Sequence, residues 1–153
     1  MFVADEIDSS DASRQQDVRD VVLVVDVANV LGARPDGWWR DRLGATERLL
    51  QSLPLLDGAG VVTPDGSPCL LRGLVAVLEG KARDARVPHG VVPVRAAGSG
   101  DDALVSYVER ATAEAGTLVV VTADRGLRQR LPETVQVLGP GWLRDRLDVL
   151  DRG

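Results

Sequence analysis

Acidic residues recur at the ends of the apolar segments of this sequence. Three separate apolar segments end on or just before an acid, namely Asp26, Glu79 and Asp124, and a glycine-rich turn delivers Asp101 and Asp102 to a predicted helix start. Parallel strands would bring all five carboxyl groups to one edge of a sheet. Like charges that close repel one another unless they are neutralised. The pattern therefore indicates a site for a hard divalent cation, Mg²⁺ or Mn²⁺.

Asn29, three residues after Asp26, would add a neutral carbonyl ligand or orient a water. Each acid also has an ordinary structural explanation, because an Asp after a strand often caps a helix or forms a turn. Asp101 and Asp102 could merely complement a helix dipole, and Glu79 before a glycine could be a solvated loop residue. The combination on one predicted edge favours a shared metal site, with Asp26, Asp102 and Asp124 as ligands, Asp101 as ligand or water-orienting group, and Glu79 as a further ligand.

Basic residues occupy the loops expected at the same edge. They are Arg34, Arg40, Arg42, Lys81, Arg83, Arg86, Arg125 and Arg128. An acidic centre rimmed by positive charge suits a polyanionic substrate, because cations can hold flanking phosphates. Arg125, Arg40 and Lys81 are the candidates for phosphate contact, although ordinary solvated side chains would look the same. Of the neighbouring Trp38 and Trp39, one is expected in the core, and the other either covers the sheet or stacks on a base.

The elements that must position these residues alternate along the chain. Continuous apolar runs rich in β-branched residues predict strands covered on both faces, at Val21–Val25, Leu74–Leu78, Val91–Val94, Leu118–Thr122 and Thr134–Leu138. Helical spacing predicts helices over Trp38–Leu53, Asp101–Glu114, Gly126–Leu131 and Gly141–Leu150, and residues 54–72 are expected to form a loop or a small hairpin. The alternation predicts an α/β fold, a three-layer α/β/α sandwich on a mostly parallel, Rossmann-like sheet.

Length and composition limit the classes of protein that the sequence can encode. The 153 residues fit one domain, which we place at residues 20–153 after a flexible acidic tail at residues 1–19. No apolar run is long enough to cross a membrane and the start lacks a signal peptide, so we expect a cytoplasmic protein. One cysteine and one histidine exclude an internal disulfide and a Cys/His zinc site. The net charge of −5 argues against indiscriminate binding of nucleic acid. The oligomeric state stays open, a homodimer included.

Three short motifs, in this order, resemble those of the PIN-like nuclease superfamily. They read Val-Val-Asp26-x-x-Asn29-Val, Gly98-Ser99-Gly100-Asp101-Asp102-Ala103 and Val-Val-Thr122-Ala123-Asp124-Arg125. The sequence looks closest to the NYN branch, including the YacP-like proteins, over about residues 20 to 140. The resemblance implies a Rossmann-like three-layer fold and metal-dependent hydrolysis of RNA, with Asp26, Asn29, one or both of Asp101 and Asp102, and Asp124 at the metal. Thr122 stands where these families often have a hydroxyl residue, and we expect it among the residues that contact substrate.

One residue departs from the pattern of the NYN branch. The first motif there usually reads Asp-Gly-x-Asn, whereas this chain has Val27 in place of the glycine. A β-branched residue disfavours a positive φ, so this turn must use an ordinary backbone conformation or store strain.

The sequence thus predicts a phosphodiester hydrolase dependent on Mg²⁺ or Mn²⁺, a ribonuclease acting on RNA. An alternative is a nucleoside-triphosphate pyrophosphohydrolase or phosphohydrolase with the same metals, although no nucleoside pocket can be identified from the residues. A non-catalytic RNA-binding module is another. A dinucleotide-binding domain, suggested by Gly98-x-Gly100-x-x-Ala103, is disfavoured because Asp101 and Asp102 occupy the helix start where a pyrophosphate would bind.

Overall fold

A computed structural model describes residues 18–113 and 117–152 of the chain. In chain order the elements are β1 (Arg19–Asp26), α2 (Val27–Gly32), the 3₁₀ turn η1 (Trp38–Arg40), α3 (Arg42–Ser52), η2 (Leu53–Leu56), β2 (Gly60–Val62), β3 (Pro68–Leu78), η3 (Gly80–Ala82), β4 (Val91–Arg95), α4 (Gly100–Ala113), β5 (Thr117–Val121), α5 (Arg125–Arg130), β6 (Gln136–Leu138) and α6 (Pro140–Arg152). The predicted tail falls almost wholly outside the described residues, and β1 already begins at Arg19.

The strands form one six-stranded sheet in which β1 is central. The order is β2-β3-β1-β5-β6, and β4 pairs with the same strand, β3, as β2 does. Every pairing is parallel except that of β2 with β3. The two partners of β3 use different lengths of it, because β2 pairs with Pro68–Leu70 and β4 pairs with Leu74–Leu78. The mostly parallel sheet predicted from the sequence is therefore confirmed.

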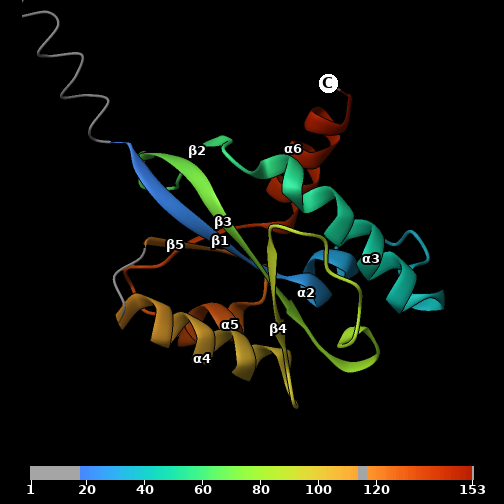
Figure 1. Cartoon of the computed structure of the whole chain (residues 1–153). Coiled ribbons are helices and arrows are strands. Elements are labelled where there is room, and N and C mark those ends of the chain that lie inside the picture. Colours follow the sequence, from blue (N-terminus) through green and yellow to red (C-terminus); the bar gives the residue numbers. More distant parts are fainter. Residues whose placement is uncertain (1–17, 114–116, 153) are drawn as a thin grey trace, which may run out of the picture.

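Helices cover both faces of this sheet, as Figure 1 shows. Alternate residues of a strand point to opposite faces, and both sets are apolar here. Leu23 and Val25 pack with α2, α3 and α6 in one core cluster, whereas Val24 packs with α4 and α5 in a second. This is why the strand sequences read as continuous apolar runs. The fold is the predicted three-layer α/β/α arrangement. Among the described residues, no helix is both long and apolar enough to cross a membrane.

The segment from Trp38 to Leu53 differs from its prediction as a single helix. A short 3₁₀ turn ends at Arg40, and α3 starts afresh after Asp41, whose side chain accepts a hydrogen bond of 2.9 Å from the amide of Gly44. Trp39 is 53% exposed and Leu43 is 43% exposed, so neither belongs to the core, contrary to the predicted apolar stripe. Trp38 is the tryptophan that packs against the core.

Two further differences from the prediction concern helix α2 and strand β3. Helix α2 was not predicted, because six residues give too little periodicity to distinguish a helix from a turn. Its first residue is Val27, which is helical and buried, so the departure from glycine is accommodated by ordinary backbone. Residues 54–72 contain the β2–β3 hairpin, and β3 extends as one strand of 11 residues back to Pro68.

Candidate functional site

The candidate site lies where β1, β3 and β5 end. Asp26 is the last residue of β1, at the edge of the sheet where the neighbouring parallel strands also have their carboxyl ends. Its carboxylate is only 7% exposed and also caps α2. One oxygen, Oδ1, accepts from the amide of Asn29 at 3.4 Å, and the other, Oδ2, accepts from the hydroxyl of Thr122 at 2.9 Å. Asp26 is therefore held in one orientation at the centre of the sheet edge.

The segment after β5 is tied to this carboxylate through Thr122. The same Thr122 hydroxyl accepts a hydrogen bond of 3.2 Å from the amide of Asp124. The side-chain oxygen of Asn29 accepts a second one, of 2.8 Å, from the amide of Ala123. The bonds from Thr122 to Asp26 and from Ala123 to Asn29 join residues more than 90 positions apart. Together with the bond between Asp124 and Thr122 they fix the start of α5, where Asp124 caps the helix by accepting from Leu127 at 2.9 Å.

These contacts assign Thr122 and Asn29 to positioning. Thr122 was expected among the residues that contact substrate, but it is 1% exposed and its hydroxyl is shared between Asp26 and the backbone of Asp124. Asn29 likewise uses its carbonyl oxygen for the backbone after β5. Both residues therefore hold the acidic side chains in place.

Glu79, which follows β3, reaches the start of α4. Its carboxylate oxygen Oε2 accepts from the amide of Gly100 at 2.7 Å. A side chain at position 100 would not fit, since a Cβ there would lie 2.7–2.9 Å from the carboxyl atoms of Glu79. A carboxylate thus occupies the helix N-terminus where a dinucleotide-binding domain would hold its pyrophosphate, which argues against that alternative.

The two acids at the start of α4 differ in surroundings. Asp102 is exposed, and its Oδ1 accepts from Arg130 of α5 at 2.8 Å in an exposed ion pair. Asp101 is half-buried, and its charge interacts with those of Asp124 and Glu79. Asp101 is therefore the acid of this pair that interacts with Asp124 and Glu79, while Asp102 interacts with Asp101 and Arg130. The sequence predicts both acids at the metal, because nothing in it indicates that Asp102 pairs with Arg130.

The electrostatics of the group confirm that the carboxylates influence one another. Burial raises the pKa of Asp26 from 3.8 to about 6, against the opposing effect of its two hydrogen bonds and with further increases from Asp101 and Glu79. Burial also raises the pKa of Asp101, and the charges of Asp124 and Glu79 raise it further. Within the described residues, no arginine or lysine forms an ion pair with any of these four acids. The charge of Arg130 opposes the rise at Asp101, but no positive charge among the described residues acts in this way on Asp26, whose negative charge is left uncompensated.

This donor set suits a hard divalent cation. Oxygen ligands and unneutralised charge are what Mg²⁺ and Mn²⁺ require. Across residues 18–113 and 117–152, no three acidic, histidine or cysteine side chains lie close enough together to share an ion. Mg²⁺ commonly binds through one or two carboxylates and keeps several waters, so the fit is to an ion held by a pair of these acids. Asp26, Asp101 and Asp124 are the residues that could supply that pair, with Glu79 beside them.

The basic residues expected to contact phosphate are all exposed. Lys81 lies in η3, two residues after Glu79, and Arg125 is the first residue of α5, directly after Asp124. Arg40 is the last residue of η1, which follows α2 in the chain. Lys81 and Arg125 thus flank the acids in sequence and at the sheet edge, whereas nothing places Arg40 beside them.

Comparison with known proteins gives a likeness in fold. No protein-family model matches the sequence, and no curated protein matches it either. Among solved structures, the crystal structure of Rae1 (YacP) from Bacillus subtilis, as its W164L mutant, superimposes with a TM-score of 0.62. The match covers 86% of this chain and 77% of that one, at 15% sequence identity. The chain therefore has a YacP-like fold, in agreement with the branch that its motifs resemble.

Proposed function

We propose that this protein is a metal-dependent ribonuclease, a hydrolase of phosphodiester bonds that uses Mg²⁺ or Mn²⁺. The observation on which the proposal depends is the buried Asp26, with its raised pKa, beside Asp101, Glu79 and Asp124 and without a neutralising cation among the described residues. Burying an unpaired carboxylate is unfavourable, and groups with perturbed pKa values that converge at one edge are typical of functional sites.

In this proposal two of the three acids Asp26, Asp101 and Asp124 bind the ion directly, and the third acid and Glu79 hold it through bound waters. An ion bound there would polarise the phosphate and make an attacking water more acidic. Thr122 and Asn29 hold Asp26 and the backbone before Asp124 at a fixed separation. Arg125 and Lys81 hold the phosphates on either side of the scissile bond.

One likeness supports RNA as the substrate, and a second supports the fold that the first implies. The order and spacing of the motifs resemble the NYN branch of the PIN-like nucleases, and the fold is that of a protein named YacP. They come from different properties of the chain, because the first uses short motifs and the second uses backbone geometry at 15% identity.

The experiment compares substrates and variants of the full chain. End-labelled RNA and nucleoside triphosphates are incubated with the protein in Mn²⁺, in Mg²⁺ or in a chelator. We expect metal-dependent cleavage of RNA that Asp26→Asn and Asp124→Asn abolish. Asp41→Asn is the matched control, because Asp41 also caps a helix but is not among the charges that act on Asp26 or Asp101, and it should cleave like the unchanged protein.

Two results would count against this function. Cleavage that persists in a chelator, or in both the Asp26 and Asp124 variants, would exclude the proposed site. Hydrolysis of triphosphates with no cleavage of RNA would favour the phosphohydrolase alternative. If no substrate is cleaved but Mn²⁺ raises the melting temperature, the protein binds metal without this activity and the ribonuclease proposal fails.

A further inference from the structure

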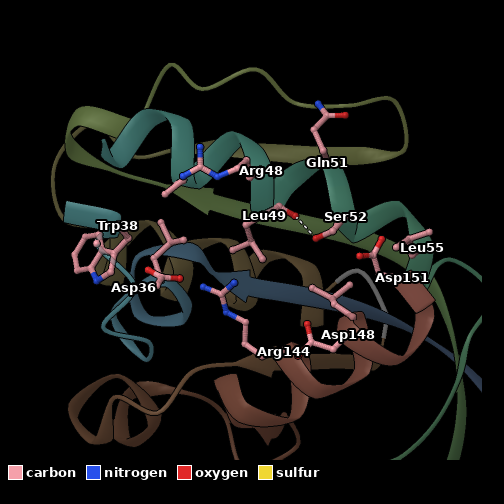
Figure 2. Close-up of a pocket in the computed structure, with 14 residues that line it drawn as sticks. Asp36, Trp38, Arg48, Leu49, Gln51, Ser52, Leu55, Arg144, Asp148 and Asp151 are labelled. Carbon is pink, nitrogen blue, oxygen red and sulfur yellow. Dashed lines mark hydrogen bonds between the residues drawn. The ribbon is translucent and has the colours of Figure 1, made fainter. Parts of the chain in front are cut away.

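A second concavity lies between α3 and α6, on the face of the sheet that these helices cover. Its volume is about 730 Å³. Figure 2 shows Arg144 of α6 reaching into its middle beneath Leu49 of α3, with Asp36 and Trp38 at one end and Asp151 at the other. The pocket combines an apolar wall with charged groups, as ligand sites do. The acids of the candidate active site do not line it.

Arg144 is the unusual residue of this pocket. Its Nε and Nη2 atoms are buried, yet neither has a hydrogen-bond partner among the described residues. Burial lowers the pKa of Arg144 and the nearby charge of Arg34 lowers it further, against the opposing charges of Asp36 and Asp148. Buried donors without partners are costly and are rare in folded proteins. A ligand in the pocket can supply the missing acceptors if the half-buried side chain of Arg144 turns so that these two atoms face the pocket.

The geometry of the free donors limits what that ligand can be. Nε and Nη2 lie on one edge of the planar guanidinium, so they present two parallel N–H groups to two adjacent acceptors. A carboxylate, a phosphate and the O6/N7 edge of guanine all offer such a pair.

The other charges of the pocket distinguish these ligands. Arg48 is the second basic residue of the lining, which also contains three acids, namely Asp36, Asp148 and Asp151. Asp148 is paired with Arg34 at 3.1 Å. Asp36 and Asp151 form no ion pair among the described residues, although the charge of Asp36 acts on Arg144. Carboxylates disfavour an anion but accept hydrogen bonds from the N1–H and N2–H groups of a guanine. Adenine presents one acceptor and one donor to an arginine where guanine presents two acceptors.

Trp38 connects this pocket with the acidic site. Its ring is partly buried, lines the pocket, and lies 5.7 Å from the guanidinium of Arg42. Trp38 and Leu31 also line a small cavity whose wall includes Glu79. A base bound beside Trp38 would therefore sit next to the elements that position the acids, and aromatic rings are favourable stacking surfaces for bases.

We propose that the pocket between α3 and α6 binds a guanine base of the RNA substrate, with Arg144 donating to its O6 and N7. This inference rests on the proposed ribonuclease function and adds a base preference to it. Arg144 is then the residue that determines specificity, Asp36 or Asp151 accepts from the opposite edge of the base, and Trp38 forms a wall of the site.

The test measures binding to the full chain by calorimetry in a chelator, so that it is independent of cleavage. The first probes are guanosine, adenosine and inorganic phosphate; the second are an oligoadenylate and the same RNA with one central guanosine. We expect guanosine to bind more tightly than adenosine, phosphate not to compete, and the central guanosine to tighten binding of the RNA. The variant Arg144→Met should weaken guanosine binding by about tenfold or more.

Variants separate a binding role from a structural one. Arg144→Met removes two buried donors that have no partner, so its melting temperature should be unchanged or higher. Arg144→Lys retains the charge but not the planar pair of donors, and should also lose the preference for guanine. Arg152→Met makes the same change at an exposed position of the same helix and should bind like the unchanged protein.

The outcomes also separate this inference from the function it depends on. Metal-dependent RNA cleavage without guanosine binding would overturn the guanine pocket and leave the ribonuclease proposal intact. Guanosine binding that Arg144→Lys and Arg144→Met leave unchanged would overturn it too, as would phosphate that competes with guanosine. Guanosine binding without any gain from the central guanosine of the RNA would overturn the assignment to the substrate.

Discussion

The substitution Asp26→Asn tests the central carboxylate through stability as well as activity. In the folded protein the pKa of Asp26 is about 6, against 3.8 for an ordinary aspartate. The folded state therefore holds a proton that the unfolded state has released between these two pH values. Stability falls as the pH rises through this window, and above about pH 6 the full cost of the buried charge is present. An asparagine carries no charge at any of these pH values.

The raised pKa sets the size of the effect. A rise from 3.8 to about 6 corresponds to about 3 kcal/mol of stability lost once the carboxylate is ionised. Asparagine keeps one acceptor oxygen and loses the other, which costs about 1 kcal/mol. At pH 7.5 without metal, Asp26→Asn should then be more stable by about 2 kcal/mol, or about 4–8 °C in melting temperature for a chain of this size. At pH 4 this advantage should disappear, because the native carboxyl is then largely protonated.

Thermal unfolding from pH 4 to 8 in a chelator, followed by circular dichroism, measures this difference. Asp41→Asn is again the control, because it alters an exposed helix cap and asparagine caps about as well as aspartate. Its curve should run parallel to that of the unchanged protein. Added Mn²⁺ should stabilise the unchanged protein at pH 7.5 and do much less for Asp26→Asn. The buried-charge reasoning would be refuted if the melting temperatures of Asp26→Asn and of the unchanged protein changed in parallel with pH. It would also be refuted if Asp26→Asn were less stable than the unchanged protein at pH 7.5.

Three further substitutions probe the surroundings of that carboxylate. Thr122→Val removes the buried hydroxyl and should lower Mn²⁺ affinity by about 10–100-fold, measured by calorimetry, whereas Thr122→Ser should retain it. Gly100→Ala should displace the Glu79 carboxylate from the helix start, lowering Mn²⁺ affinity while the fold seen by circular dichroism is kept. Asp101→Asn should reduce RNA cleavage far more than Asp102→Asn, whose carboxylate is in an exposed ion pair; equal losses would show that both acids serve the site.

The strands β1, β3 and β5 were predictable because most of their residues are buried on one face or the other. Val24 faces one core cluster and Val25 the other, so the sequence shows an unbroken apolar run. Short elements were not predictable in this way. Helix α2 has one and a half turns, and the break at Asp41 depends on a single side-chain cap. Both features depend on very few residues, so the sequence contains little information that predicts them.

Placing the acids at one edge followed from parallel topology alone, but their orientation did not. Asp101 and Asp102 are adjacent on a helix and therefore point about 100° apart. Which of them faces the centre depends on the position of α5, because Arg130 of that helix pairs with Asp102. Packing of helices α4 and α5 against one face of the sheet fixes this contact, and no spacing in the sequence encodes it.

The pocket between α3 and α6 was even less predictable from the sequence, since its residues come from three separate segments. It also shares a physical property with the acidic edge. Asp26 and Arg144 are both charged groups whose burial shifts the pKa toward the neutral form, and no ion pair among the described residues includes either of them. Replacing either should therefore stabilise the protein when no ligand is present. Retaining such groups at the expense of stability is expected where a ligand supplies the opposite charge or the missing acceptors. A cation at one site and a base at the other would do this for the same RNA chain.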